Sequence, residues 1–447
     1  MKAPLRDTPM RTATFACDVL VAGGGVAALC AAISAREAGA SVILAEKAPV
    51  EMRGGNTRHS RNFRVAHDEA SHLSPGTYSA DEYFVEIMQV AGEAGNEALA
   101  QTLAHESKTV VTWLAERDVV FENCERGRIP GSRKTVFVLG GGKAMVNALY
   151  AAAMRCGVTV LYDCGITAIC EDGPAAMLRH GSHQTVAYKA MVVCTGGYQA
   201  NPQWLESELG SEMADFVNRG TPFAEGELLQ SLLNMGAKAV GVPGACHLVA
   251  VDARSPRHDG GIITRVKNIP LGMVVDCFGR RFHAEDAEEG PSRYSMWGNL
   301  IAKRPRQRAT LILDEAARCR SGPSAFLPLR AENLAEMADL LRVEPGNLRK
   351  SVQEHGRLAG PPYWAIPLCP GITFTGRGVA VDPQARVVMN DDTPCDNLFA
   401  AGMIMAPNII TSDYLAGTAI TIGAVFGRIA GQGATRHAIA QADADRR

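Results

Sequence analysis

The chain has 447 residues, of which 47% are hydrophobic and 21% are charged, and its formal net charge is −2. This composition is ordinary for a soluble globular protein, and the length predicts two domains because one hydrophobic core rarely serves so long a chain. A nearly neutral chain lacks the strong basic excess that holds a phosphate backbone, which argues against nucleic-acid binding.

The cysteines and the apolar segments argue against two further classes of protein. The twelve cysteines include no C-x-x-C pair, and no histidines cluster at zinc-binding spacing, so we interpret the cysteines as buried thiols of a reducing compartment. We expect no metal or iron–sulfur centre. Residues 1–16 lack the apolar core of a secretory signal, and no run of about eighteen apolar residues occurs. We therefore expect a cytoplasmic protein that does not span a membrane.

The first predicted element is a nucleotide-binding βαβ unit in residues 17–47. Its strand, turn, helix and second strand are expected at residues 18–22, 23–25, 26–38 and 41–45. The spacing Gly23-x-Gly25-x-x-Ala28 lets the backbone approach a pyrophosphate, to which the helix N-terminus offers free N–H groups. Glu46 ends the second strand and can accept hydrogen bonds from ribose hydroxyls. The alternative is a glycine-rich turn in an ordinary α/β sheet, but all five parts of the unit agree with nucleotide binding.

A polar loop at residues 53–64 follows, and its arginines suit contact with an anion or a polar cofactor. Three of them, Arg58, Arg61 and Arg64, either face a bound group or form a solvated basic loop. The next expected elements are helices within 79–115 and over 143–156, and strands at 135–139, 158–162 and 165–170. A buried strand at 190–194 then runs into a second glycine turn, where the backbone would again pass close to a nucleotide.

The character of the sequence changes at Pro243. Prolines, a Gly-Gly pair, a mixed-charge run at 280–293 and an amphipathic stretch at 331–356 predict an inserted α+β domain, which we call the cap. Strand patterns return at 379–382 and 398–402, and a helix of small residues is expected at 417–431. The expected fold class is thus α/β, with a Rossmann-like domain in residues 1–242 and 373–447 and the cap in 243–372.

The order of these motifs resembles that of the fumarate reductase and succinate dehydrogenase flavoproteins. The matching segments are 23–28 with Glu46, 54–57, 194–198, 276–285, 401–402 and 415–420, and they extend over nearly the whole chain. Within this family the sequence is most similar to the tricarballylate dehydrogenases, at residues 56–64, 246–247, 259–261, 265 and 292–298. The flavoprotein half of an aerobic cobalamin-pathway monooxygenase is similar too, and these motifs do not separate the two.

The resemblance implies FAD held by the larger domain, with the flavin ring at the junction with the cap. A non-covalent link is expected, because the covalent members have a histidine where this sequence has Asn56. For Glu285, the alternative to an FAD contact is a solvated acid of the cap. The implied FAD-binding residues are Gly23, Gly25, Val26, Ala27, Ala28, Glu46, Lys47, Gly54, Gly55, Asn56, Thr57, Thr195, Gly196, Gly197, Glu285, Gly402, Met403, Ala416, Gly417, Ala419 and Ile420.

The resemblance also implies a substrate that carries carboxylates, for which the planar fork of arginine is well suited. By family position Arg293 is the proton-transfer group, although arginine stays protonated in proteins; the alternative is a surface arginine. His247 either anchors a carboxylate or is a structural histidine. Arg265, beside Thr264, falls where fumarate reductases have a glutamate, so it would attract a third carboxylate, unless the count is off and it faces solvent.

Three positions depart from the fumarate reductase pattern. Phe374 and Tyr414 replace a histidine and an arginine that hold dicarboxylates in the family, which favours a larger or differently held acid over fumarate or succinate. Met403 replaces an acid that commonly meets the ribityl chain, so FAD affinity is expected to be weaker than usual.

We therefore interpret the sequence as an FAD-dependent dehydrogenase that oxidises a saturated polycarboxylic acid by hydride transfer to flavin N5, with tricarballylate going to cis-aconitate. The alternatives are a flavoprotein monooxygenase of the cobalamin (precorrin) pathway, a fumarate reductase-like enoate reductase, and a non-catalytic FAD-binding subunit. Electrons are expected to leave to a separate protein with iron–sulfur or haem centres. If that acceptor is membrane-bound, it would place this protein at the inner membrane as a peripheral protein.

Overall fold

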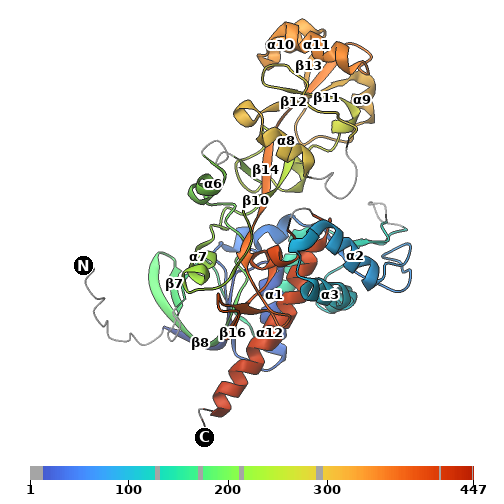
Figure 1. The fold of residues 1–447 in the computed structure, drawn as a ribbon. Helices are drawn as coiled ribbons and strands as arrows, with labels where there is room; N and C mark the ends of the chain where they lie inside the picture. The colour runs from blue at the N-terminus through green and yellow to red at the C-terminus, as the bar shows by residue number, and fades with distance from the viewer. Residues whose placement is uncertain are drawn as a thin grey trace, which may run out of the picture.

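The computed structural model describes residues 14–125, 131–169, 175–210, 216–287, 295–411, 414–444 and 446. These residues form two lobes (Figure 1). The larger lobe combines both ends of the chain, and the smaller lobe is formed by residues from the middle of the sequence, drawn in yellow and orange. This arrangement agrees with an insertion into a nucleotide-binding domain.

An eight-stranded sheet forms the centre of the larger lobe. Its main path is β15 (Arg386–Val388), β16 (Pro394–Ala400), β8 (Ser182–Val193), β1 (Phe15–Ala22), β2 (Val42–Ala45) and β5 (Thr159–Leu161). The strands β6 (Cys164–Ala168) and β7 (Ala175–Arg179) extend it beside β8. Strand β1 pairs in parallel with both β2 and β8, so the chain enters the sheet at its centre. The predicted Rossmann-like arrangement is confirmed.

Helix α1 (Val26–Glu37) lacks a polar face because it is covered on every side. Its residues 26–35 are all buried. It packs against the sheet and against the long C-terminal helix α12 (Thr418–Ala444), where Gly427 and Gly431 allow close approach. A Cβ on these glycines would lie 2.4 Å from the carbonyl oxygen of Ala27 and 2.2 Å from that of Ala31. Helices α1 and α12 therefore pack closely against each other.

The predicted helices within 79–115 are present, and two of them begin at side-chain caps. The Ser79 side chain accepts a hydrogen bond from the Glu82 amide, and the Asn96 side chain accepts one from Leu99. The helices are α2 (Ala80–Ala91), α3 (Glu97–Glu106) and α4 (Val110–Ala115). The other elements of this lobe are β3 (Asn62–Arg64), β4 (Thr135–Phe137), α5 (Gly141–Arg155), α6 (Pro202–Leu209) and α7 (Glu227–Asn234).

A six-stranded sheet organises the smaller lobe and the connection between the lobes. It contains β10 (Ala239–Asp252), β14 (Tyr363–Val379), β12 (Ala309–Asp314) and β11 (Met273–Asp276), with β13 (Leu329–Ala331) and β9 (Val217–Asn218) beside β14. Its helices are α8 (Met296–Ala302), α9 (Glu315–Arg320), α10 (Leu334–Leu341) and α11 (Pro345–His355).

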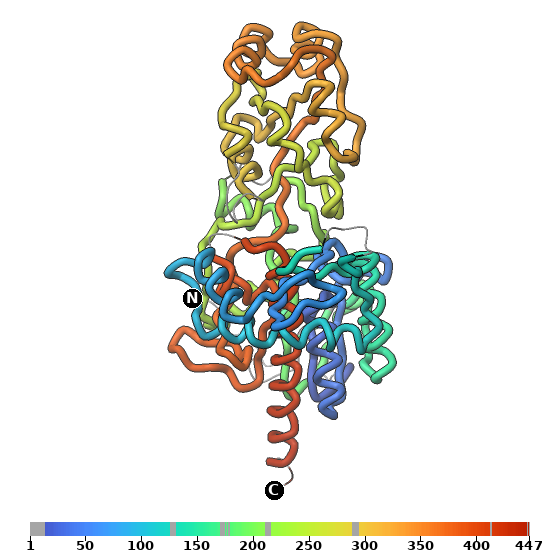
Figure 2. The backbone as a smooth tube through the Cα atoms, turned by 90° about the vertical axis from the view of Figure 1, so that its right-hand side faces the viewer, coloured from blue at the N-terminus to red at the C-terminus, as the bar shows by residue number. Residues whose placement is uncertain are grey.

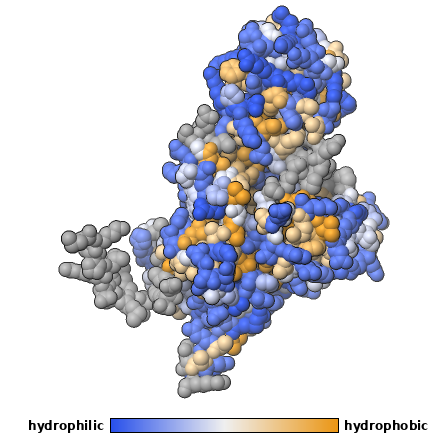
Figure 3. All heavy atoms as spheres, viewed as in Figure 1, coloured by the Kyte–Doolittle hydropathy of each residue, from blue (hydrophilic) through white to orange (hydrophobic). Residues whose placement is uncertain are grey.

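The lobes are joined by β10 and β14, which pair antiparallel over most of their length and run from one lobe to the other (Figure 1). The predicted domain boundaries at residues 243 and 372 fall inside these two strands. Figure 2 shows that the molecule is narrow where they cross. A hydropathy-coloured view shows apolar residues gathered around this junction on one face (Figure 3).

Several predicted elements differ in extent, among them the strand expected at 190–194, which begins at Ser182 as β8. The helix expected to end at residue 431 continues to Ala444, and the amphipathic stretch 331–356 divides into β13, α10 and α11. The strand expected at 379–382 is the end of β14 followed by a single bridge at Val381. Within the described ranges, no helix has the length and apolar character needed to cross a membrane.

Candidate FAD and substrate site

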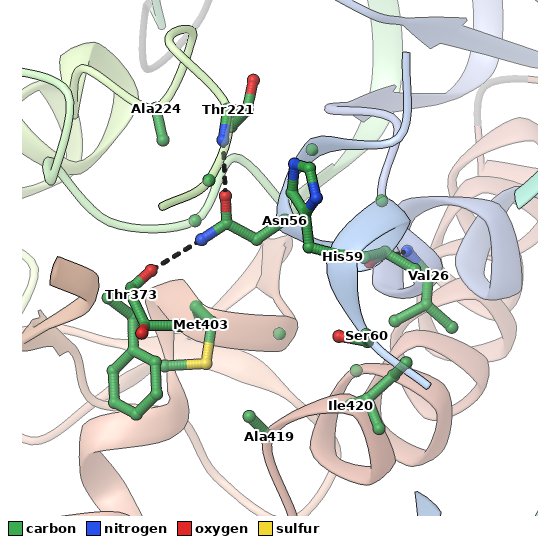
Figure 4. Close-up of a pocket in the computed structure, with 18 of the residues that line it drawn as sticks. Val26, Asn56, His59, Ser60, Thr221, Ala224, Thr373, Met403, Ala419 and Ile420 are labelled. Atoms are coloured by element: carbon green, nitrogen blue, oxygen red, sulfur yellow. Dashed lines mark hydrogen bonds between the residues drawn. The ribbon is translucent and has the colours of Figure 1, made fainter. Parts of the chain in front are cut away.

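A cavity of about 630 Å³ lies where the carboxyl ends of β1 and β2 meet the segments that lead to the smaller lobe. Its walls come from both sheets, from the loop before β3 and from the start of α12 (Figure 4). Ligands of open α/β sheets bind at this edge of the sheet. The cavity is therefore the candidate site.

The glycine turn after β1 leaves room that side chains would fill. A Cβ on Gly23, where φ is +111°, would lie 2.5 Å from the carbonyl oxygen of Cys194. A Cβ on Gly24 would lie 1.9 Å from the Glu46 carboxylate, so the glycine lets this acid reach the turn. Glu46 accepts backbone N–H bonds from Ala48 and Gly54. Burial raises the pKa of its carboxyl group.

The second wall is formed by residues 53–64, which follow β2 and include β3 and which we call the flavin loop. Asn56 accepts a hydrogen bond from the Thr221 amide and donates one to the Thr373 carbonyl oxygen, at 2.9 and 2.6 Å (Figure 4). Thr57 accepts a hydrogen bond from the amide of Val26, the first residue of α1. The loop is thus tied to the start of α1, to β14 and to the segment that follows β9.

The rest of the cavity wall is formed by small residues near Thr195 and at the start of α12. The Thr195 hydroxyl is buried in the cavity wall and has no hydrogen-bond partner in the structure. The start of α12 contributes a cradle in which a Cβ on Gly417 would lie 2.7 Å from the Arg64 amide nitrogen. A glycine turn, an acid at the end of β2, a hydroxyl without a described partner and a helix N-terminus together fit FAD.

Most of the predicted FAD residues line this cavity. They are Gly23, Gly25, Val26, Ala27, Glu46, Lys47, Gly55, Asn56, Thr57, Thr195, Gly196, Gly402, Met403, Ala416, Gly417, Ala419 and Ile420. The Lys47 ammonium is paired with the carboxylates of Glu225 and Glu227. This pairing leaves Lys47 less suited to bind a phosphate than an unpaired lysine would be.

Three predicted FAD residues shape the site without lining it. Ala28 is fully buried inside α1. Gly54 has a φ of +102° and donates its amide to Glu46, and a Cβ there would collide with Val146. Gly197 packs against Thr375, whose hydroxyl would lie 2.2 Å from a Cβ. These residues permit the turns and do not form the cavity wall.

The prediction for Glu285 is wrong, and so is its alternative of a solvated acid. The side chain is 1% exposed inside the smaller lobe, away from the cavity lining. It accepts a hydrogen bond from the Val274 amide at 2.8 Å and pairs with Arg281 at 2.6 Å. Glu285 therefore holds a loop of the smaller lobe together.

Cationic side chains gather at one end of the cavity. Arg61, Arg219, Arg265 and Lys267 all line it. Arg219 is 8% exposed and donates from Nη1 to the Thr373 hydroxyl at 2.7 Å, and its buried Nε has no hydrogen-bond partner among the described residues. Burial and the neighbouring charge of Arg265 lower the pKa of Arg219 to about 10. Burial, Arg61 and Arg265 likewise lower the pKa of Lys267.

His247 lies beside this cationic cluster. It faces Phe374, one of the three positions that depart from the family pattern. It pairs across the sheet with Phe374, with ring centroids 5.0 Å apart and planes within 9°. The Tyr414 ring lies 4.9 Å from it on another side. Burial, Arg219 and Arg265 lower the pKa of His247 to about 3, so its ring is neutral near pH 7. A neutral ring can hydrogen-bond a carboxylate without attracting it as a cation does.

The other substrate predictions have mixed outcomes. Arg265 lines the cavity, which agrees with a role in the site. Thr264 is buried beside the cavity and donates its hydroxyl to the Gly261 carbonyl oxygen. Of the loop arginines, Arg61 reaches the cavity, whereas Arg64 pairs with Glu86 and Arg58 with Asp259. Arg293 lies outside the described residues and stays a prediction.

Three residues of the site were not predicted from the sequence: Arg219, its partner Thr373, and Thr221, whose amide donates to Asn56. Arg219 follows the two-residue strand β9, and nothing in its local pattern distinguishes it from a loop arginine. A small residue next to it, Gly220, was the available signal. A Cβ there would lie 1.9 Å from the Asn56 side chain, so the segment must pass close to the flavin loop.

Comparisons with known proteins agree with this geometry. A family model described as "FAD binding domain" matches residues 18–419. A probable fumarate reductase, Ifc3, of Shewanella frigidimarina is 25% identical, with 94% of this chain aligned to 75% of that one. An NADH:fumarate oxidoreductase of Klebsiella pneumoniae is 24% identical, over 94% of this chain and 48% of that one.

The fold is similar to that of a solved flavoenzyme structure, the open conformation of a flavocytochrome c3 fumarate reductase. The TM-score is 0.78 at 23% identity, over 96% of this chain and 79% of the other. Because the family model spans most of the sequence and the cavity fits the cofactor, the chain belongs to the FAD binding domain family of the fumarate reductase and succinate dehydrogenase flavoproteins and is an FAD-dependent oxidoreductase.

Proposed function

We propose that this oxidoreductase dehydrogenates a saturated polycarboxylic acid to its enoate, with tricarballylate going to cis-aconitate as the favoured reaction. The observation that supports the proposal most is the cationic end of the cavity, where Arg61, Arg219, Arg265 and Lys267 come together. Arg265 lowers the pKa of the buried Arg219, and Arg61 and Arg265 lower that of Lys267, so these cations repel one another and attract a ligand with several negative charges.

Each part of the chain has a task in this proposal. The bound FAD supplies the hydride acceptor. The guanidinium groups of Arg219 and Arg265 hold carboxylates through charge-assisted hydrogen bonds and so orient the reacting carbons. The apolar rings of Phe374 and Tyr414 border the same space and exclude water from it. A small dicarboxylate would leave part of the cationic cluster without a partner.

The names of the relatives favour a second candidate, reduction of an enoate. A probable fumarate reductase and an NADH:fumarate oxidoreductase both act, by their names, in the reductive direction. Fumarate itself suits this cavity less well, because Phe374 and Tyr414 cannot hold a carboxylate as a cation does. In either direction we propose that a separate protein exchanges electrons with the flavin.

Anaerobic spectroscopy of the FAD-loaded protein tests both candidates. Tricarballylate should bleach the flavin absorbance, and succinate at equal concentration should bleach it much more slowly. Dithionite-reduced protein should be reoxidised by cis-aconitate faster than by fumarate if the polycarboxylate specificity is right. Bleaching by none of the polycarboxylates, with rapid reoxidation by fumarate, would support the reductase. Oxygen-dependent hydroxylation of a carboxylate-bearing tetrapyrrole would support a monooxygenase.

A further inference from the structure

One histidine of the flavin loop is held by an acid from the segment between β10 and β11. The His59 Nε2 atom lies 2.5 Å from Asp259 Oδ1, and Arg58 Nη2 lies 3.4 Å from Asp259 Oδ2. Asp259 donates its own amide to the Gly220 carbonyl oxygen, and Gly261 donates to that of Arg219. These two backbone hydrogen bonds hold Asp259 against the segment that carries Arg219.

The pairing decides which nitrogen of His59 can accept a proton. A carboxylate only accepts hydrogen bonds, so the hydrogen of the neutral ring lies on Nε2 and the lone pair lies on Nδ1. Nδ1 faces Gly261, where a Cβ would lie 2.7 Å away, and both residues line the cavity. Within the part of the chain that the structure describes, Nδ1 has no hydrogen-bond partner. Only a glycine at position 261 leaves this nitrogen uncovered.

Among the described residues that line the cavity, the others are poorly placed to accept a proton. Arginine and lysine stay protonated near neutral pH. Glu46 is engaged by the amides of Ala48 and Gly54 beside the glycine turn, and Glu227 is paired with Lys47. His247 is stacked on Phe374 and faces two arginines, which oppose its protonation.

The surroundings of His59 suit a base. The charged groups facing it are Asp259, Arg58 and Arg219. Burial lowers the pKa of His59, and the two arginines add to this effect, while Asp259 opposes it. The ring is therefore neutral near pH 7, and Asp259 would stabilise the charge that appears when it accepts a proton.

We propose that His59, oriented by Asp259, accepts the proton that leaves the substrate carbon next to a carboxylate. The inference rests on the proposed dehydrogenation. One carbon loses a proton to His59 Nδ1, and the electron pair of that C–H bond becomes the new C=C bond. FAD held by the glycine turn and the flavin loop would supply the acceptor for the hydride of the neighbouring carbon and for both electrons of the oxidation, and His59 then passes its proton to solvent. Asp259 is a positioning residue in this scheme.

The test compares His59→Asn, His59→Gln and Asp259→Asn with the wild-type holoenzyme. In both His59 variants the rate of anaerobic bleaching by tricarballylate should fall on the order of 10²–10⁴-fold, as for loss of a general base. FAD content and the tricarballylate Kd, read from the perturbed flavin spectrum, should stay near the wild-type values. The acidic limb of the kcat/KM profile should disappear. In Asp259→Asn that limb should move to lower pH, because the carboxylate raises the pKa of His59.

A second readout does not depend on turnover. Nitrogen NMR of protein labelled with ¹⁵N-histidine should show one ring in the Nε2–H form whose signals vanish in His59→Asn. His67 is the matched control, because burial also lowers its pKa and it is bonded to Ser74, outside the cavity lining. His67→Gln should leave bleaching and the pH profile unchanged.

Three outcomes would overturn the inference. The first is bleaching by the His59 variants within about threefold of wild type with the acidic limb intact. The second is a parallel loss of FAD and activity, which would indicate a structural role. The third is an Nδ1–H tautomer for His59. Failure of wild-type protein to bleach with any polycarboxylate would instead defeat the proposed function, and the inference with it.

Discussion

The environment of Arg219 disfavours the positive charge of its guanidinium group. The side chain is 8% exposed, its Nε has no hydrogen-bond partner in the part of the chain that the structure describes, and Arg265 repels it. A buried cation that is only partly satisfied costs folding free energy, and a bound carboxylate would offset that cost. The position of Arg219 is therefore easier to explain by ligand binding than by stability.

The variant Arg219→Gln separates these two roles. We expect kcat/KM for tricarballylate to fall about 10²-fold or more, because a charge-assisted and partly buried hydrogen bond is lost. The melting temperature should not fall, since the folded state already lowers the pKa of this group to about 10 and so disfavours its charge. Steady-state kinetics and thermal melting of the same preparations provide both measurements.

The exposed Arg349 on α11 is the control for Arg219. Arg349→Gln removes the same charge from the surface of the smaller lobe and should change neither quantity. A lower melting temperature for Arg219→Gln with unchanged kinetics would show that Arg219 supports the fold.

Selectivity between tricarboxylates and dicarboxylates is predicted to depend on Arg265. Arg265→Glu should lower kcat/KM for tricarballylate about 10²-fold or more, because a carboxylate contact is lost and repulsion is added. Succinate, which lacks the third acid, should be affected much less. Competition between the two substrates in one kinetic series measures the ratio directly. Equal effects on both would show that another cation selects the substrate.

The position of a site residue could be predicted from the sequence where it depends on residues nearby in the chain. Glu46 follows a fixed number of residues after the glycine turn, so the motif alone identifies it. Arg219 reaches the site through the parallel pairing of β9 with β14, more than 150 residues away in sequence. Glu285 lies in a family motif, and its partner Arg281 is only four residues away in sequence, but the hydrogen bond from the Val274 amide depends on how the smaller lobe packs.

The elements around the cofactor were predictable for the same reason. The first βαβ unit is close to its expected bounds. Its strand, turn and helix follow one another directly in the sequence, so local patterns are enough to predict them. The contacts of Asn56 with Thr221 and Thr373 join segments 165 and 317 residues apart. The sequence indicated the flavin loop but not which segments it would meet.

The pairing of α1 with α12 predicts the effect of a small change far from the substrate. Gly431→Ala would place a Cβ 2.2 Å from the Ala31 carbonyl oxygen, which is too close for any side-chain carbon. Alanine gains about 1 kcal/mol of helix propensity, but forcing apart two packed helices typically costs about 1–3 kcal/mol. We expect a net loss in both melting temperature and FAD affinity, because α1 begins at the glycine turn.

Gln432 offers a control on the same helix, since it is exposed. Gln432→Ala should keep or slightly raise the melting temperature, measured by differential scanning fluorimetry with and without added FAD. A Gly431→Ala variant more stable than wild type would show that α1 and α12 do not approach this closely.

At the scale of the whole molecule, the site depends on both lobes. The glycine turn, the flavin loop and the start of α12 come from the larger lobe, whereas Arg265 and Lys267 lie on the loop that leads from β10 to β11. The junction is crossed by β10 and β14 and by the contact of His59 with Asp259. A two-lobed arrangement was predicted from the change of sequence character, but which side chains meet at the junction was not.

The mode of FAD attachment is a prediction about the complete holoprotein. Asn56 stands at the position of the covalent histidine, and its amide group is engaged on both sides by Thr221 and Thr373. The nearest histidine of the flavin loop, His59, is hydrogen-bonded to Asp259. We therefore expect acid or heat precipitation to release all of the yellow colour into the supernatant. Because a ligand that binds only the folded state stabilises it, free FAD added at about a hundredfold its Kd should stabilise the apoprotein by about 2.7 kcal/mol. Flavin retained on the pellet of wild-type protein, and lost in His59→Asn, would show a covalent bond to His59 instead.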